Sequence, residues 1–306
     1  VNADGYLWDP LSCPISDLLR IRIESNAFPA DINIISGNTF EVKGTVALTS
    51  PNSSNQNATA LIVGSSHLIT WTRNGDIGTL AFSFAPDGVT YGAAFATGVD
   101  STLPNYNWTV PDAVDLNVDN KVKVVAEGDT DVNDESEVFQ IKGSLDLAPD
   151  PGGSPNNSAP YHVGGSPISV QWNYTGPLGN ISLYYDTNSG TDNYPNFITT
   201  QAYNLNEDGG NICHYSWPVP NTTSNHYRVK IIQASDSTYV FDASVADFSV
   251  HGTVTLVAPG KNPGSPEAWT VDGISNNIDW SFTGTIANVD IYLDTTSGTG
   301  GYPVEI

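Results

Sequence analysis

The phrase FEVKGTV at residues 40–46 returns almost unchanged as FQIKGSL at 139–145 and as FSVHGTV at 248–254. Self-similarity at a fixed spacing indicates a repeat architecture, so this phrase decides how the chain is divided. Each copy places alternating apolar residues before one glycine, a pattern that predicts the last strand of a repeat and a joint into the next. The glycines Gly44, Gly143 and Gly252 set a period of about 100 residues, which is the size of one β-sandwich domain.

The remainder of each period follows one plan. A stretch rich in proline precedes a short alternating run around one tryptophan, in LITWTRNG, ISVQWNYTG and NIDWSFTG. A second alternating run then reaches a turn rich in Asp, Ser and Gly, as in LAFSFAPDGVTY, which predicts a strand entering a hairpin. The second half of the period runs through NYNWTVP, HYSWPVP or GYLWDP and then through KVKVVAEGD, YRVKIIQASD or LRIRIES.

Many short strands with no sustained helical period predict an all-β fold of tandem immunoglobulin-like β-sandwich repeats in an elongated array. The one helix-like piece, residues 9–19, is interrupted by Pro14 and is interpreted as a loop. The predicted boundaries give a C-terminal half-repeat at 1–44, complete repeats at 45–143 and 144–252, and an N-terminal half-repeat at 253–306.

At these residues the sequence resembles the immunoglobulin-like repeats of very large bacterial extracellular and surface proteins. It has a looser similarity to Kre9/Knh1-like cell-wall domains, which share a tryptophan strand and a later WTVP strand. The resemblance covers essentially the whole chain, and it implies an extracellular location and a mechanical or adhesive role. Such repeats have no invariant catalytic residues, so the resemblance implies no active site.

Five tryptophans are predicted to form the cores, because an inward-facing Trp on a half-buried strand removes a large apolar area from water. The alternative is that they form a platform for a ligand. They are Trp71, Trp108, Trp172, Trp217 and Trp280.

Charge excludes some partners. The chain has 33 acidic residues against 10 Lys and Arg, a formal net charge of -23, which repels nucleic acid and anionic lipid. No run of eighteen apolar residues predicts a membrane span in this segment. The lack of a starting Met and of a signal peptide indicates a mature or internal piece of a longer product. The five histidines have no metal or catalytic spacing, and no nucleophile or phosphate-binding motif is present, so we expect no enzyme.

The acidic run GDTDVNDESE at 128–137 is the candidate cation site. It is predicted to be a loop between the last two strands, and its oxygens suit Ca²⁺, although a solvated turn is the alternative. The candidate calcium ligands are Asp129, Asp131, Asn133, Asp134 and Glu135.

Two further residue types bear on the environment. Cys13 and Cys213 fall in different repeats, too far apart in an array to form a disulfide, so we expect free thiols that are buried or meet another chain. Seven Asn-x-Ser/Thr sequons are candidate glycosylation sites. They begin at Asn52, Asn57, Asn107, Asn156, Asn173, Asn180 and Asn221.

The leading functional prediction is a structural segment of an extracellular filament, stalk or giant surface protein. The alternative is an adhesin module that grips glycan or protein through the loops at 186–194 and 294–302. Because the two half-repeats together make nearly one repeat, we expect either a longer continuous array or head-to-tail self-association, in which one chain completes the next.

Overall fold

In the computed structural model, two compact units are distinguished by their internal contacts. One contains Val1–Ser144 with Thr175–Pro177, and the other contains Leu145–Tyr174 with Leu178–Ile306. The structure describes residues 5–9, 15–112, 116, 118–147, 155, 157–207, 212–260, 268–271, 275–296, 301–302 and 304–306. The described part is almost entirely strands and turns, and none of its helices is long and apolar enough to cross a membrane.

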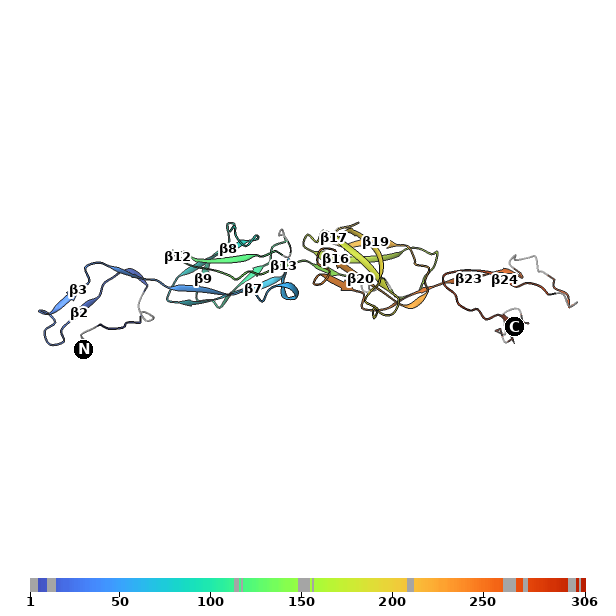
Figure 1. Cartoon of the computed structure of the whole chain (residues 1–306), viewed down its shortest axis with the longest axis horizontal. Coiled ribbons are helices and arrows are strands. Elements are labelled where there is room, and N and C mark those ends of the chain that lie inside the picture. Colours follow the sequence, from blue (N-terminus) through green and yellow to red (C-terminus); the bar gives the residue numbers. More distant parts are fainter. Residues whose placement is uncertain are drawn as a thin grey trace. The chain divides into compact units, whose positions relative to one another are not determined.

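The first unit contains a sandwich of two sheets (Figure 1). One sheet has the strand order β10-β7-β5 and the other β12-β11-β8-β9, while β6 and β13 form a separate parallel pair. The strands are β5 (Thr45–Ser50), β6 (Leu61–Ile62), β7 (Ser66–Asn74), β8 (Thr79–Ala85), β9 (Ala94–Asp100), β10 (Asn105–Thr109), β11 (Lys121–Ala126), β12 (Asp129–Glu135) and β13 (Ile141–Lys142). A single 3-10 turn, η2 (Asn57–Thr59), precedes β6.

The second unit contains a sandwich with the same succession of strands. One sheet has the order β14-β16-β19 and the other β15-β22-β20-β17-β18, with β21 also paired to β20. The strands are β14 (Ser144–Asp146), β15 (Tyr161–His162), β16 (Ile168–Thr175), β17 (Asn180–Asp186), β18 (Asn196–Ala202), β19 (Ile212–Trp217), β20 (Ser224–Gln233), β21 (Phe241–Ala243) and β22 (Phe248–His251). In each sandwich three strands face a sheet of four or more, and the main sheets are antiparallel except for the parallel pair β15–β22. This is the immunoglobulin-like sandwich that the sequence predicts.

Alternation along each strand builds the two cores. In β11, KVKVVA, the three apolar residues that point inward are buried and the lysines between them are half-buried. Trp71, Trp108, Trp172 and Trp217 are buried, and the indole N–H groups of the first and third have backbone partners. Trp71 Nε1 donates to Ser101 O at 3.2 Å, and Trp172 Nε1 donates to Tyr203 O at 2.8 Å. The same tryptophan therefore occupies the same place in both sandwiches.

The terminal halves form partial sheets. The N-terminal half contains β1 (Ser16–Leu19), β2 (Arg22–Glu24), β3 (Asn33–Ile35) and β4 (Phe40–Val42), with β1 paired to β4 and β2 to β3. The C-terminal half contains β23 (Thr253–Ala258), β24 (Asp279–Thr283), β25 (Tyr292–Leu293) and β26 (Val304–Glu305), paired as β23-β24 and β25-β26. In Figure 1, β2 and β3 extend beyond the first sandwich and β23 and β24 extend beyond the second, each within its own unit.

Three expectations about these halves are corrected. Ser16–Leu19 is a strand and not a loop, because its amides pair with β4. Residues 5–9, expected as a strand, are extended without strand partners. Trp280, expected in a core, is 40% exposed, because the described strands of its half form only two-stranded sheets.

The repeated phrase is two successive strands at all three positions, separated by Lys43 and Gly44 at the first and by a single glycine at the other two. Gly44 is packed so closely that an added Cβ would meet Ile77 and lie 2.8 Å from Asn74 O. A second glycine faces it: Gly75 has φ +80°, and its Cβ position lies 3.5 Å from Gly44 Cα. Gly143 with Gly176 in the first unit, and Gly252 with Gly284 in the second, form the same pair.

Candidate functional site

The acidic run does not form the predicted loop. Glu127 and Gly128 make the turn, and Asp129–Glu135 is the strand β12, paired antiparallel with β11. A strand turns successive side chains to opposite faces, so the five candidate ligands cannot converge on one ion as they would in a loop. Within the described ranges, no group of three or more His, Cys, Asp and Glu side chains is arranged to hold a metal. Calcium binding at these residues stays a prediction.

Two of the candidate ligands contact a lysine from the first joint. Lys43 Nζ lies 2.7 Å from Asp131 Oδ2 and 3.1 Å from Asp129 Oδ2, with Glu41 Oε1 at 3.2 Å. The hydrogen bonds that Lys43 donates to Asp131 and then to Asp129 raise its pKa well above its usual range. The ammonium group thus takes the position that a cation would need, and it attaches β12 to the phrase FEVKG.

Asp134 has a structural role that the sequence did not reveal. Its Oδ2 accepts a hydrogen bond of 2.8 Å from the amide of Leu48, on the first strand of the opposite sheet. In the second sandwich Asp242 Oδ2 accepts from the amide of Leu147 at 2.7 Å. Each carboxylate therefore ties a strand of one sheet, β12 or β21, to the opposite sheet, at Leu48 in β5 or at Leu147 directly after β14. The signal in the sequence was an Asp two residues before a Ser, at 134–136 and 242–244.

The remaining two candidate ligands, Asn133 and Glu135, contact residues of β12 and of the neighbouring strand β11. Asn133 Nδ2 donates to the carbonyls of Thr130 and Asp131, at 2.9 and 3.2 Å. Glu135 lies 3.5 Å from Lys121 and 3.7 Å from Lys123, on the neighbouring strand β11. These are surface ion pairs, which usually stabilise a fold by less than about 1 kcal/mol each.

A polar cluster at one end of the second sandwich gathers a Ser, a His, an Arg and an Asp. Asp247 accepts hydrogen bonds from Ser189 Oγ at 2.6 Å and from Arg228 Nε at 2.6 Å, and His226 Nδ1 lies 3.1 Å away. Burial opposes the charge on Asp247, but these three partners outweigh it and lower its pKa to about 2. Ser189 Oγ and Asp247 approach the same imidazole nitrogen, so the cluster lacks the relay of a hydrolase, which needs opposite nitrogens.

The loop at 186–194 is one of the two loops predicted to bind a ligand, and hydrogen bonds to Asp186 stabilise its conformation. Asp186 is buried, and its carboxylate accepts hydrogen bonds from the amides of Gly190 and Asp192, at 3.2 and 3.0 Å, and from Asn188. In the loop at 294–302, Asp294 Oδ1 accepts from the amide of Thr296 at 2.9 Å. In both loops the first aspartate accepts a hydrogen bond from the amide two residues later, Asn188 in one and Thr296 in the other. This bond stabilises a turn.

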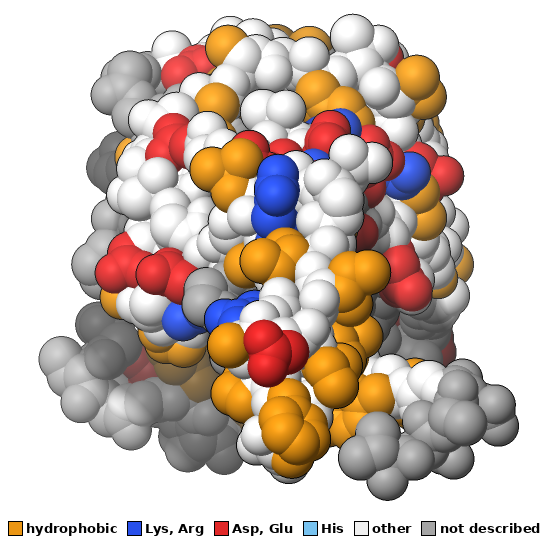
Figure 2. All heavy atoms as spheres, turned by 90° about the vertical axis from the view of Figure 1, so that its left-hand side faces the viewer, with side chains coloured by type: hydrophobic (Ala, Val, Ile, Leu, Met, Phe, Trp, Pro, Cys, Tyr) orange, Lys and Arg blue, Asp and Glu red, His pale blue; other side chains and the backbone are white. Residues whose placement is uncertain are grey.

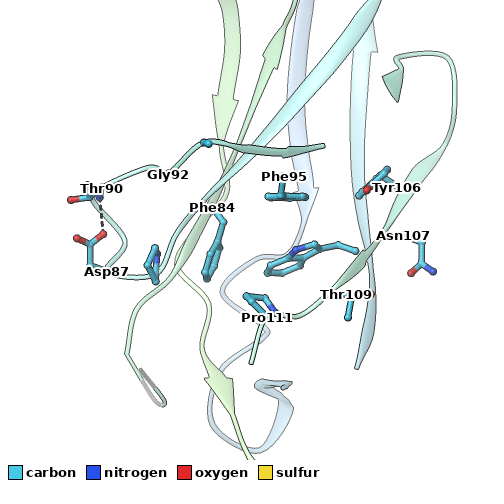
Figure 3. A pocket seen from close by; sticks show the side chains of 12 residues that line it. Phe84, Asp87, Thr90, Gly92, Phe95, Tyr106, Asn107, Thr109 and Pro111 are labelled. Carbon is cyan, nitrogen blue, oxygen red and sulfur yellow. Dashed lines mark hydrogen bonds between the residues drawn. The ribbon is translucent and has the colours of Figure 1, made fainter. Parts of the chain in front are cut away.

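The first sandwich has one open groove with aromatic walls, of about 880 Å³. The rings of Phe84 and Phe95 pack against the buried indole of Trp108, with centroids 5.4 and 5.5 Å from it. Figure 3 shows Phe84 and Phe95 among the side chains that line the groove. Pro111 lies beside them, while the side chain of Asn107 points away from the rings. The groove lies at the edge where β9 and β10 leave the two sheets unpaired.

The sequons differ in accessibility. Asn57, Asn107, Asn180 and Asn221 are exposed, whereas Asn52 and Asn173 are half-buried. Asn156 and Cys13 lie outside the described residues. Cys213 is a free thiol buried in the second core.

Large exposed apolar side chains are concentrated on the two terminal halves. Figure 2, which faces the side where the N-terminal half lies, shows hydrophobic side chains gathered on the projecting segment. On the N-terminal half these are Tyr6, Leu7, Trp8, Leu18, Ile21, Ile23, Phe28, Ile32, Ile34 and Ile35. On the C-terminal half they are Val254, Leu256, Val257, Trp269, Val271, Trp280, Phe282, Val289, Tyr292, Leu293, Tyr302, Val304 and Ile306.

Comparison with known proteins gives only distant structural likenesses. No protein-family model and no curated protein sequence matches the chain. Solved structures similar to it include the fibronectin(III)-like modules of Clostridium thermocellum CbhA, at 13% identity over 67% of this chain and 93% of that one, with a TM-score of 0.21. The ICAM-5 D1–D4 ectodomain fragment has 9% identity over 75% and 61%, with a TM-score of 0.32. Rst D1-D2 has 9% identity over 67% and 98%, with a TM-score of 0.23.

The class of protein therefore follows from the chain's own strand order. In each complete sandwich a three-stranded sheet packs against a sheet of four or more strands. This arrangement is that of immunoglobulin-like and fibronectin-like domains.

Proposed function

We propose that this chain is a structural segment of an extracellular filament, stalk or large surface protein, in which immunoglobulin-like sandwiches follow one another end to end. The observation that carries the proposal is the joint: β4, β13 and β22 continue into β5, β14 and β23 across one or two residues that include Gly44, Gly143 or Gly252. A connection without a linker transmits tension directly from one sandwich to the next.

The pairing inside each sandwich suits tension. Strand β6 lies near the beginning of the first sandwich and β13 at its end, and the two pair in parallel, Leu61 opposite Ile141. In the second, Tyr161 of β15 pairs in parallel with Val250 of β22. Pulling the ends of a sandwich apart draws such parallel strands past each other, so their hydrogen bonds must break together and not one after another.

Single-molecule stretching of the chain tests this role. Each complete sandwich should unfold in one event that releases about 350 Å, since roughly 100 residues extend by ~3.6 Å each. Replacing Val163 by Pro removes the amide that donates to His251 O at 3.0 Å, and it should lower the force of one of the two events. Smooth extension without discrete events would contradict a load-bearing role.

The aromatic groove favours a second candidate function, an adhesin module that binds glycan or protein. Its Phe84, Phe95 and Trp108 offer an apolar wall at the open edge of the sandwich. If binding is the function, a screen of glycans and matrix proteins should yield a ligand whose affinity falls when Phe95 is replaced by Ala. A ligand that binds both variants equally would exclude the groove.

A further inference from the structure

We propose that residues 253–306 of one copy of this chain bind residues 5–44 of a second copy, so that the two halves close one more sandwich between chains. The inference rests on the proposed structural function, because it names the partner that continues the array. Four sets of contacts support it, and each shows a terminal half folded as the matching part of a complete sandwich.

The pairing of the N-terminal half has the register of the second sandwich. In β1 and β4, Ser16 pairs with Val42 and Leu19 with Phe40, with an irregularity between the two pairs. In β20 and β22, Ser224 pairs with Val250 and Tyr227 with Phe248, again with an irregularity between them. In both pairings the two contacts lie three residues apart on the first strand and two residues apart on the second.

A serine fixes the next pair of strands in all three places. The amide of Ile21 donates to Ser36 Oγ at 3.2 Å, and the amide of Ser36 donates back to Ile21 O at 2.8 Å. Val122 and Ser136 exchange the same two bonds at 3.0 and 2.8 Å, as do Val229 and Ser244 at 3.0 and 2.9 Å. Ile21 therefore occupies the place of two fully buried valines.

Trp8 of the N-terminal half packs against a phenylalanine in the same way as its counterparts Trp108 and Trp217. Trp8 meets Phe40 edge-on, with centroids 6.0 Å apart and planes at 85°. The matching pairs are Trp108 with Phe139, at 6.2 Å and 86°, and Trp217 with Phe248, at 6.5 Å and 88°. Trp108 and Trp217 are covered by an opposite sheet, whereas Trp8 is exposed.

The C-terminal half supplies the other part of the plan. In β23 and β24, Thr253 pairs with Thr283 and Leu256 with Trp280. In β5 and β7, Thr45 pairs with Asn74 and Leu48 with Trp71. Strands β23 to β26 thus correspond to β5, β7, β8 and β9, and the N-terminal strands β1 to β4 correspond to β11, β12 and β13. Neither half repeats a strand of the other.

The complete sandwiches predict the register of the joined halves. In the second sandwich, Leu183 of β17 pairs with Ile231 of β20 and Tyr185 with Val229. The same offsets place Ile291 of one copy opposite Ile23 of the next, and Leu293 opposite Ile21. Ile23 is 67% exposed in the single chain, whereas its counterparts Val124 and Ile231 are fully buried.

The joint gives an independent contact. A Cβ added to Gly176 would lie 3.0 Å from Val63, and one added to Gly284 would lie 3.0 Å from Val163. The third valine in this position, Val271, is fully exposed, and Gly75 is the third glycine. We therefore expect Val271 of one copy to rest against Gly75 of the next. Val271 closes the joint at which Gly44 and Gly75 already touch Ile15.

A second copy fits because both halves expose apolar faces and their strands match complementary parts of one sandwich. Burying such a face stabilises association by about 25 cal/mol for each Å² removed from water, less the cost of fixing the two partners. Strand addition also satisfies the amides at the open sheet edges.

The first experiment compares the full chain with Ile23→Asp by analytical ultracentrifugation. The wild type should form a series of oligomers that grows with concentration, and Ile23→Asp should reduce it to monomer. The matched control is Val245→Asp, which also places a carboxylate on an exposed apolar residue, 83% exposed, but on a complete sandwich. A monomeric wild type, or an Ile23→Asp chain that assembles equally well, would overturn the proposal.

The second experiment tests the register by oxidation. A chain with Cys13→Ser, Ile23→Cys and Ile291→Cys should form a ladder of disulfide-linked chains. The control exchanges Ile23→Cys for Arg22→Cys, one residue along the strand and facing the other way. Equal ladders from both chains would overturn the register. Native material that keeps a mass many times 32.6 kDa in denaturant and reductant would show a continuous chain and overturn the second copy as partner.

Failure of this interface can be told from failure of the structural role. A monomer that still unfolds in two discrete events under tension would leave the proposed function intact and exclude the second copy.

Discussion

Single carboxylates hold the two sheets of each sandwich together. The sequence predicts Asp134 as a calcium ligand and gives no role to Asp242, yet each carboxylate accepts a hydrogen bond from a backbone amide of the opposite sheet. The two partners of each contact lie 86 and 95 positions apart, so the local Asp-x-Ser pattern marks the carboxylate but does not reveal the amide that it binds. The tryptophans, by contrast, were predictable because an alternating strand with one large ring has few other arrangements.

Replacing Asp134 by Ala should lower the free energy of unfolding of the first sandwich by about 1–3 kcal/mol, because the amide of Leu48 loses its partner in a half-buried place. Urea unfolding would measure it. The control Asp131→Ala removes the same charge from an exposed position on the same strand, and it should cost less than about 1 kcal/mol. Equal losses for the two variants would contradict the inter-sheet role.

Asp247 predicts a dependence of stability on acid. Its pKa is lowered to about 2 in the folded chain from 3.8, so its stabilising effect is complete above pH ~4 and is lost as the pH falls toward 2. Urea unfolding between pH 6 and 2 should show that the free energy of unfolding falls less steeply with pH in Asp247→Asn than in the wild type. The exposed Asp112→Asn is the control. Identical pH profiles for wild type and Asp247→Asn would rule out this contribution.

At the scale of elements, the repeated phrase could be predicted from the sequence, but the glycine that packs against it could not. Sequence spacing identified Gly44, Gly143 and Gly252, since the flanking FxVxG pattern recurs. The facing glycines, Gly75 and Gly176, sit among ordinary turn residues and become visible only where two backbones meet. The acidic run was misjudged for a related reason: only Val132 within β12 is a buried apolar residue, which is too few to show alternation.

Gly44→Ala should destabilise the first joint by about 1–3 kcal/mol, because the new methyl group would meet Ile77 and the backbone of Asn74. Gly128→Ala is the matched control, since nothing lies within 4 Å of its Cβ position. Thermal unfolding of the two variants measures the difference. If Gly44→Ala unfolds at the wild-type temperature, the close packing of the joint is wrong.

Calcium binding by β12 requires the ion to displace Lys43 from Asp129 and Asp131. If calcium binds there, melting curves in millimolar calcium and in chelator should separate, by about 2.7 kcal/mol of stability at a hundredfold excess over Kd. Lys43→Ala should widen the separation, because it frees both carboxylates. Coinciding curves for both chains would exclude the site.

For the whole molecule, charge and apolar surface act in opposite directions. A net charge of -23 makes copies repel each other, whereas the two exposed half-sandwich faces attract. Because salt screens the repulsion over roughly 10 Å at 0.1 M and leaves apolar burial in place, assembly should increase from 10 mM to 150 mM NaCl. Light scattering across this range measures it, and dissociation on adding salt would contradict an apolar interface.

Electron microscopy of the purified 306-residue chain at physiological salt tests the central claim most directly. The account predicts unbranched filaments in which three sandwiches recur per chain, two complete within a chain and one closed between neighbours. Dispersed single particles at every concentration, with both half-repeats left open, would contradict it.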